Sequence, residues 1–144
     1  MIEKASVSDA AAVAELALKL WPDHTPEELR EEFAELLARE DAAVFLALRD
    51  GTAMGFAQCQ LRRDYVEGTE NSPVGYLEGI YVQKAFRGQG IARALLEACE
   101  DWARSRDCRE FASDCELDNR DSLYFHLRSG FREANRIICF VKPL

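Results

Sequence analysis

The 144-residue sequence lacks several features that would point to export, membrane insertion or metal binding. No stretch approaches the roughly 18 consecutive apolar residues that a transmembrane helix requires. The opening residues, MIEKASVSDA, contain no apolar segment of the kind found in a secretory signal peptide. The five cysteines form an odd count without a Cys-x-x-Cys pair, which disfavours a disulfide framework and a zinc site. We therefore expect a cytoplasmic protein with reduced cysteines, no metal and no membrane contact.

Positive charge is also scarce, because 18 Lys and Arg residues face 26 Asp and Glu residues and the net charge is −8. Nucleic acid is not an expected partner, since its phosphates would be repelled rather than neutralised. A cationic partner is the natural complement of this charge. Part of the excess lies at residues 27–41, which form either a solvated helix face or an acidic rim that attracts a polycationic substrate.

The chain has the length of one domain spanning residues 1–144, and no linker, repeat or low-complexity segment divides it. A short strand at residues 2–5 precedes a helix whose apolar positions recur at helical spacing up to Trp21. Thr25-Pro26 marks the start of a second helix that runs to about residue 40. Strands at residues 42–48 and 53–61 flank an Asp50-Gly51 hairpin turn.

The second half continues with a long polar loop at residues 62–73 and a strand at residues 74–82. A helix follows from about residue 91, and then a strand at residues 108–114. A fourth helix at residues 119–129 ends at Gly130, and residues 131–141 are expected to supply one or two closing strands. This order of elements predicts an α/β protein with a mixed sheet.

The most informative segment is the run YLEGIYVQKAFRGQGIAR at residues 76–93. A strand rich in β-branched and aromatic residues passes into an Arg/Gly-rich turn, and the turn opens a helix. Such a turn gathers backbone N–H groups and the positive end of a helix dipole around a small volume, which suits phosphate. It lacks the Lys-Ser/Thr of a Walker loop and the three-glycine spacing of a dinucleotide fold. It contains instead Arg-x-x-Gly-x-Ala, at Arg87, Gly90 and Ala92.

This pattern resembles the acyl-CoA pyrophosphate signature of the GNAT superfamily of N-acyltransferases. Asn119 and the Gly130-Phe131 pair stand where that superfamily has an asparagine, a short helix and a Gly-Phe pair after the fifth strand. The order of the predicted elements agrees over nearly the whole chain. The resemblance implies an α/β GNAT fold, with a mixed, mostly antiparallel sheet flanked by about four helices.

Longer strings narrow the resemblance to the aminoglycoside 6'-N-acetyltransferases. They are Trp21 and the runs YVEGTENSPVG at residues 65–75, LEGIYV at residues 77–82 and EFASD at residues 110–114. The resemblance implies that the aminoglycoside is bound by Trp21, Tyr65, Glu78 and Asp114. Close relatives carry a further substrate-contacting glutamate where this chain has Asn135, so the ring specificity stays open.

The same resemblance implies the contacts with acetyl-CoA and a homodimeric state. The acetyl-pantetheine arm is expected to bind the backbone of Ile80, Tyr81 and Val82. The pyrophosphate is expected at the turn formed by Arg87, Gly88, Gln89, Gly90, Ile91, Ala92 and Arg93, and CoA is also expected to contact Asn119. The tyrosine that many GNAT enzymes place four residues before the Gly-Phe glycine is replaced here by His126, as in the close relatives.

The residue chemistry supports the same site without the family. Transfer of an acyl group to an amine requires a donor that polarises the thioester carbonyl, a neutral amine beside it, and a route for the proton. Strand N–H groups near Val82 can be that donor if strand pairing is broken there. Glu78 and Asp114 are suited to hold ammonium groups if both strands end at one cleft. Glu78 and Asp114 are both catalytic candidates, because a carboxylate near the reacting amine can take its proton directly or through water. Asp114 is then either the base or only an ammonium anchor.

Three candidates have alternative roles. Trp21, at a helix end, either covers the core or stacks on a sugar ring. His126 either protonates the departing CoA thiolate or has a structural role. Cys115, next to Asp114, would permit a covalent thioester mechanism, but no histidine that could activate it is nearby in the sequence.

We therefore predict an acetyl-CoA-dependent enzyme that acetylates the 6'-amine of aminoglycosides by direct attack in a ternary complex, which confers resistance. One alternative is an acetyltransferase of a polyamine or a protein amine. Another is a non-catalytic acyl-CoA-binding module that regulates a partner. The intact carboxylates of Glu78 and Asp114 favour an enzyme, because a degenerate site has no reason to retain them.

Overall fold

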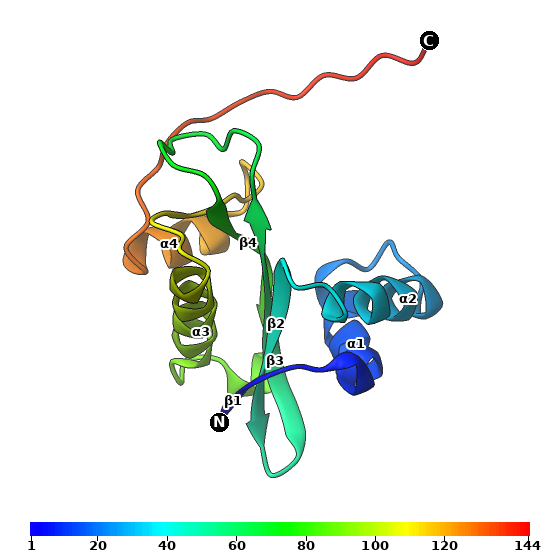
Figure 1. Ribbon diagram of the computed structural model, residues 1–144. Helices are drawn as coiled ribbons and strands as arrows, with labels where there is room; N and C mark the ends of the chain where they lie inside the picture. Colours follow the sequence, from blue (N-terminus) through cyan, green and yellow to red (C-terminus); the bar gives the residue numbers. More distant parts are fainter.

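A five-stranded sheet separates two helical layers in the computed structural model, which describes residues 1–144 (Figure 1). The elements are β1 (Ile2–Lys4), α1 (Ala10–Leu20), α2 (Pro26–Leu37), β2 (Ala42–Arg49), β3 (Thr52–Arg62), β4 (Val74–Val82), α3 (Ile91–Ser105), β5 (Phe111–Ser113) and α4 (Arg120–Arg128). Two single-turn 3-10 helices, η1 (Val7–Asp9) and η2 (Lys84–Phe86), precede α1 and α3. Helices α1 and α2 cover one face of the sheet, and α3 and α4 lie on the other (Figure 1).

The strands follow one another across the sheet in chain order, β1-β2-β3-β4-β5. Neighbours from β1 to β4 are antiparallel, and β5 joins β4 in parallel. The predicted mixed, mostly antiparallel sheet with four α-helices is therefore confirmed. The chain returns to the sheet through α3 because a parallel neighbour needs a crossover connection.

Local sequence signals start and turn several elements as expected. Thr25 Oγ1 accepts from the Glu28 N–H (3.2 Å) and Glu28 Oε2 accepts from the Thr25 N–H (3.4 Å), which forms a capping box ahead of Pro26. Asp50 and Gly51, at φ values of 50° and 78°, form the tight turn between β2 and β3. Both positions take the left-handed conformation that such two-residue hairpins require.

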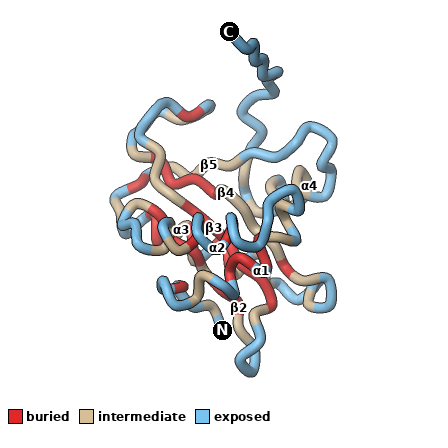
Figure 2. Tube along the Cα trace, turned by 90° about the vertical axis from the view of Figure 1, so that its right-hand side faces the viewer, coloured by how far each residue is buried: buried red, intermediate tan, exposed pale blue.

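The core fills both sides of the sheet (Figure 2). One cluster joins the sheet to α3 through Leu95, Leu96 and Cys99, all at most 2% exposed. A second cluster joins it to α1 and α2 through Val13, Leu29 and other apolar side chains. Because both faces are covered, the middle of the sheet is rigid and can hold a site at its edge. No helix of the protein has the length and apolar character needed to cross a membrane.

The predicted closing strands at residues 131–141 are wrong for this single chain. The C-terminal tail, residues 132–144, forms no strand and extends away from the sheet (Figures 1 and 2). Its large apolar side chains are exposed, from Ile137 at 71% to Val141 at 96%. The strand predicted at residues 108–114 is also shorter, at Phe111–Ser113. A strand forms only where a neighbouring backbone pairs with it, and the tail has none.

Candidate functional site

Strands β4 and β5 separate after a short paired stretch. Pairing runs from Gly75 with Phe111 to Leu77 with Ser113 and then stops. Strand β4 continues to Val82, while the chain after Ser113 turns away. The outer edge of β4 beyond Leu77 therefore offers unpaired backbone groups beside a gap in the sheet.

Glu78 occupies a β-bulge in β4. Leu77 is opposite Cys59 and Gly79 is opposite Gln58, so Glu78 has no partner in the register with β3. A bulge inserts one extra residue, so each backbone group after it faces the edge of the strand opposite to the one that it would face in a regular strand. Nothing in the pattern of residues 74–82 indicates this irregularity within an otherwise regular strand.

The shift directs two predicted cofactor contacts to the open edge. The Gln83 N–H donates to the Met54 carbonyl (2.8 Å), so Gln83 faces β3. Backbone groups alternate along a strand, so Val82 and Ile80 face the other edge. The carbonyl of Val82 indeed accepts from Arg87 Nε on that side (2.9 Å). The N–H groups of Ile80 and Val82 can thus donate a hydrogen bond to an oxygen atom of a ligand, whereas the N–H group of Tyr81 faces β3.

The glycine-rich turn that follows presents six consecutive N–H groups, from Gly88 to Arg93, without a backbone partner. The first donor of α3 to find an acceptor is Ala94, which bonds the Gly90 carbonyl (3.1 Å). Gly88 and Gly90 have φ values of 77° and 80°, and a side chain at either would meet open space. The turn is a concave cluster of donors at a helix N-terminus, which favours an anion such as pyrophosphate.

Asn119 and His126 lie on or next to α4. Asn119 caps the helix, with its Oδ1 accepting from the Ser122 N–H (3.1 Å). Both ring nitrogens of His126 are occupied: Nδ1 lies 2.6 Å from the Ser122 carbonyl and Nε2 lies 2.8 Å from Ser113 Oγ. His126 therefore reaches the gap between β4 and β5 only through Ser113. Its predicted role as a proton donor stays a prediction.

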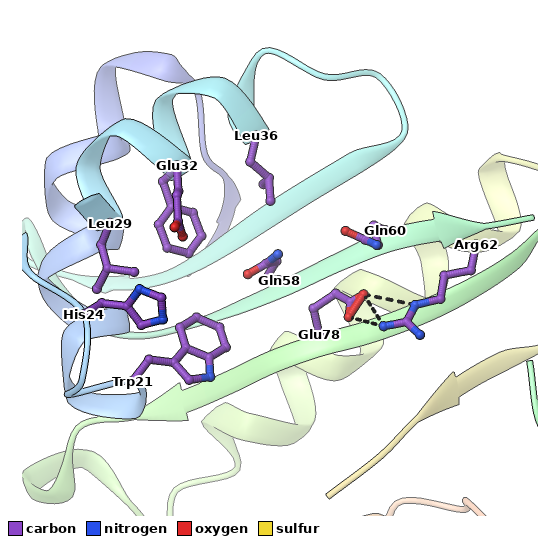
Figure 3. Close-up of a pocket in the computed structure, with 10 residues that line it drawn as sticks. Trp21, His24, Leu29, Glu32, Leu36, Gln58, Gln60, Arg62 and Glu78 are labelled. Carbon is purple, nitrogen blue, oxygen red and sulfur yellow. Dashed lines mark hydrogen bonds and ion pairs between the residues drawn. The ribbon is translucent and has the colours of Figure 1, made fainter. Parts of the chain in front are cut away.

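On the opposite face, α1 and α2 form a pocket with the sheet that has a volume of about 350 Å³. Trp21 and Glu78, two of the predicted substrate residues, both line it (Figure 3). The remaining lining residues are His24, Leu29, Glu32, Phe33, Leu36, Gln58, Gln60 and Arg62. Carboxylates, amides and an aromatic ring in one pocket suit a ligand with ammonium and hydroxyl groups.

Trp21 is fixed by close packing against β4. Its indole contacts Phe56 edge to face, at 6.2 Å between the ring centroids. A Cβ at Gly79 would lie 2.7 Å from the Trp21 ring, so only glycine leaves room for the indole. The ring is half-buried, so one part of it covers the core and the other lines the pocket, and its contact with a ligand stays a prediction.

Glu78 is paired with Arg62 at the end of β3 (Figure 3). Arg62 Nη2 lies 2.6 Å from Oε1 and 2.9 Å from Oε2, and Nε lies 3.2 Å from Oε2. Burial works against the charge on the guanidinium, but the hydrogen bonds that it donates to Glu78 raise the pKa of Arg62. The side chain of Glu78 is only 16% exposed in an apolar strand, and this ion pair offsets the free-energy cost of burying its charge.

Asp114 lies just beyond β5 and outside the lining of this pocket. It is exposed, and its Oδ2 accepts a short hydrogen bond from the Tyr76 hydroxyl. Burial and this bond raise the pKa of Tyr76. The Tyr76 ring in turn lies under the Arg62 guanidinium, whose Cζ is 3.5 Å from the ring centroid. Asp114 is thereby connected to Glu78 through two intervening side chains.

Tyr65 and Asn135 lie away from the pocket lining. Tyr65 is 76% exposed in the loop between β3 and β4. Glu110 Oε1 holds that loop, accepting from the Glu70 N–H (2.9 Å) and the Asn71 N–H (2.8 Å), and the contact with Asn71 lowers the pKa of Glu110. Asn135 donates from Nδ2 to Glu67 Oε1 on the same loop (3.1 Å). Tyr65 thus lies on the loop between β3 and β4, and Asn135 lies on the C-terminal tail where the tail contacts that loop.

Sequence reasoning missed Arg62 and Tyr76, which hold the two carboxylates, and the polar pocket residues His24, Gln58 and Gln60. The two glutamines alternate with Cys59 on β3, a pattern that could have indicated a polar face. No sequence signal pairs Arg62 with Glu78, because the register of β3 and β4 contains the bulge. No group of three or more His, Cys, Asp or Glu side chains is arranged to hold a metal ion.

Comparison with known proteins finds close relatives. A family model described as the Acetyltransferase (GNAT) family matches residues 10–131. An aminoglycoside N(6')-acetyltransferase type 1 from Stenotrophomonas maltophilia is 47% identical over 144 residues, which cover 99% of this chain and 93% of the relative. A protein of the same name from Klebsiella aerogenes is 40% identical over 148 residues, with 100% and 97% covered.

Solved structures share the fold over the whole chain. The aminoglycoside acetyltransferase AAC(6')-Iy, in complex with the bisubstrate analogue CoA-S-monomethyl-acetylneamine, is 36% identical with a TM-score of 0.95, covering 100% of this chain and 98% of that one. The apo 6'-N-acetyltransferase AAC(6')-IG from Acinetobacter haemolyticus is 40% identical with a TM-score of 0.94, covering 100% and 99%.

Proposed function

The chain belongs to the acetyltransferase (GNAT) family, and we propose that it transfers the acetyl group of acetyl-CoA to the 6'-amine of aminoglycosides, which confers resistance. The observation that carries this function is the gap between β4 and β5, with a donor-lined turn at one end and the carboxylates Glu78 and Asp114 on the acceptor side. The relatives of 40% and 47% identity are named for this activity.

Acetyl-CoA is held by backbone donors in this proposal. The N–H groups from Gly88 to Arg93 bind the pyrophosphate, and Asn119 contacts CoA from the start of α4. The edge of β4 at Ile80 and Val82 binds the acetyl-pantetheine arm. One of these two N–H groups donates to the thioester oxygen and stabilises the negative charge that develops there. A related solved structure contains CoA, which supports this half of the site.

The acceptor is held by carboxylates. Glu78 binds an ammonium group in the pocket, Trp21 supports a sugar ring, and Tyr65 and Asn135 contact the ligand from the rim. The Asp114 Oδ1 has no hydrogen-bond partner, so it is available to the reacting amine. It takes the amine proton directly or through one water as the new C–N bond forms and the C–S bond breaks.

The attack is direct, within a ternary complex. Cys115 is exposed, and both nitrogens of His126 are already bonded to other groups, so no imidazole activates this thiol. The thiolate leaves as CoA and receives its proton from His126, acting through the Ser113 hydroxyl, or from solvent. A relative binds a single molecule in which CoA is joined to an aminoglycoside fragment, which agrees with adjacent subsites. We place the protein in the cytoplasm, where its five free cysteines stay reduced.

The acceptor class is tested by measuring the thiol released from acetyl-CoA with aminoglycosides, spermidine and basic peptides in parallel. The expected result is rapid release with aminoglycosides that carry a 6'-amine and at most slow release with the others, because several carboxylates recognise a rigid polycation. Faster turnover of spermidine or a peptide would favour the polyamine or protein-amine alternative. No release with any amine would favour a non-catalytic acyl-CoA-binding module.

We also propose a homodimer, in which the C-terminal tail of each copy pairs with the other. The residue just before the tail is anchored, since Phe131 packs on His126 at 5.1 Å between the ring centroids. Beyond Arg136 the large side chains of the tail are mostly exposed, although Ile137, Ile138, Phe140 and Val141 are apolar. The outer edge of β5 is unpaired. A second copy of the chain would give both the tail and this edge a partner, because a strand from one chain can extend the sheet of the other.

Light scattering on the purified protein tests the dimer. We expect twice the chain mass of 16.3 kDa, and Ile138→Asp is expected to give monomers, because it places a charge among the paired apolar side chains. The matched control is Lys142→Asp, near the exposed end of the same tail, which should remain dimeric. A monomeric wild-type protein, or an Ile138→Asp protein that stays dimeric, would rule out this arrangement.

A further inference from the structure

Four side chains form one connected row across the acceptor face of the sheet. The row runs from Glu78 on β4 to Arg62 on β3, returns to Tyr76 on β4, and ends at Asp114 after β5. A forked ion pair joins Glu78 to Arg62, and the Arg62 guanidinium stacks on the Tyr76 ring. A hydrogen bond joins Tyr76 to Asp114. The two carboxylates proposed to bind and deprotonate the acceptor are therefore parts of one assembly.

We propose that Arg62 and Tyr76 are positioning residues for acetyl transfer, and that this row fixes the two carboxylates relative to each other before the acceptor arrives. The proposal rests on the acceptor roles of Glu78 and Asp114 in the proposed function. It assigns to Arg62 and Tyr76 no contact with the reacting atoms. Their effect passes through the carboxylates that they hold.

The hydrogen bond of Tyr76 decides which oxygen of Asp114 is free. Its hydroxyl donates to Oδ2, and no group of the protein contacts Oδ1. Tyr76 is only 6% exposed, and the Asp114 carboxylate is the one hydrogen-bond partner that its hydroxyl has in the protein. A carboxylate with one oxygen occupied keeps a fixed orientation, whereas an exposed aspartate without a partner samples several rotamers. The free oxygen is therefore held in a defined direction.

The fork of Arg62 orients Glu78 in the same way. Three hydrogen bonds of 2.6 to 3.2 Å join the guanidinium to both carboxylate oxygens. The planar guanidinium can do this while lying flat on the Tyr76 ring, at 3.5 Å from the centroid, a combination that lysine cannot reproduce. The row carries two negative charges and one positive charge, so it retains a net attraction for an ammonium group.

The test measures kcat and KM for tobramycin, an aminoglycoside with a 6'-amine, in wild type, Tyr76→Phe, Asp114→Asn and the double variant. Tyr76→Phe keeps the ring beneath Arg62 and removes only the hydroxyl. We expect kcat to fall about 10-fold with the KM for acetyl-CoA unchanged. In the Asp114→Asn background the same change is expected to lower kcat by less than about 2-fold, because Tyr76 acts only through that carboxylate.

The Arg62→Lys variant tests the other end of the row, at Glu78, independently. It keeps the positive charge but not the fork, and is expected to raise the KM for tobramycin about 10-fold in wild type, with little further effect in a Glu78→Gln background. Tyr124→Phe is the control, since Tyr124 is 52% exposed on α4 and outside the row, and should leave both constants unchanged.

The outcomes separate this proposal from the function on which it rests. A wild-type enzyme that does not acetylate tobramycin would overturn the proposed function. A wild-type enzyme that does so, together with unchanged kinetics in Tyr76→Phe and Arg62→Lys, would overturn the positioning role alone. Equal losses with and without the Asp114 carboxylate would show that Tyr76 is structural, and would also overturn it.

Discussion

Replacing Asp114 by Asn is expected to lower the turnover of tobramycin by about 100-fold or more, which is within the usual contribution of a general base. The amide has nearly the shape of the carboxylate and can still accept from the Tyr76 hydroxyl, but it cannot take a proton from the attacking amine. The dissociation constant of acetyl-CoA should not change, because its proposed contacts are backbone groups of β4 and the glycine-rich turn. Steady-state kinetics and calorimetric titration with acetyl-CoA measure the two quantities.

The matched control for this variant is Asp118→Asn, which makes the same chemical change at an exposed aspartate in the connection between β5 and α4. It should turn over tobramycin at the wild-type rate. Turnover by Asp114→Asn that equals wild type would remove Asp114 from the mechanism. A lower affinity for acetyl-CoA in that variant would place Asp114 on the cofactor side instead.

Replacing Glu78 by Gln is expected to raise the KM for tobramycin about 30-fold, as the loss of a charge-assisted hydrogen bond of about 2 kcal/mol would do. The glutamine amide can no longer attract an ammonium group, and it leaves the half-buried Arg62 without its carboxylate partner. The positive charge in the pocket then repels the polycation as well. A smaller effect on kcat is expected, because Glu78 is proposed to bind the acceptor and not to deprotonate it.

The control for Glu78→Gln is Glu100→Gln, at another partly buried glutamate, on α3 and away from the acceptor face. Burial raises the pKa of Glu100, so this change should be tolerated without loss of tobramycin binding. Thermal melting of both variants shows how much stability the Arg62–Glu78 pair contributes. If Glu78→Gln keeps the wild-type KM, recognition of the ammonium group does not involve this carboxylate.

Several elements, including the turn proposed to bind the pyrophosphate, were predictable because their signals are local. The Thr25 capping box, the Asp50-Gly51 turn and the glycine-rich turn each depend on residues a few positions apart in the chain. The bounds of β4 were predicted as observed, from its run of β-branched and aromatic residues. The resemblance to the GNAT superfamily then supplied the mixed, mostly antiparallel sheet and the approximate number of helices that flank it.

The acceptor side was less predictable, because its geometry depends on contacts between distant residues. The bulge at Glu78 arises from how β3 and β4 pair, so the fork from Arg62 cannot be found from spacing along the chain. Tyr76 has the pattern of a core residue in an apolar strand, and its hydroxyl gains a role only where β5 brings Asp114 beside it. Trp21 and Glu78, which the resemblance assigned to the aminoglycoside, line one pocket, and their contacts with the ligand stay a prediction.

The tail shows a different limit. The apolar run at residues 137–141 has strong β-propensity, and the sequence favours a strand there. Propensity describes only one half of a strand pair, and does not say whether the partner belongs to the same chain. In the single chain no backbone pairs with these residues, so they stay extended and exposed. A partner strand from a second copy is what the proposed dimer would supply.

Two aminoglycosides that differ only at position 6', one with an amine and one with a hydroxyl, test the proposed acetylation of the 6'-amine. CoA release is measured by thiol detection, and the product is located by mass spectrometry and NMR. We predict one equivalent of CoA and a single acetyl group on the 6'-nitrogen of the amine, with no product from the hydroxyl compound. N-acetylation of the 6'-hydroxyl compound at another amine, at a comparable rate, would contradict the account.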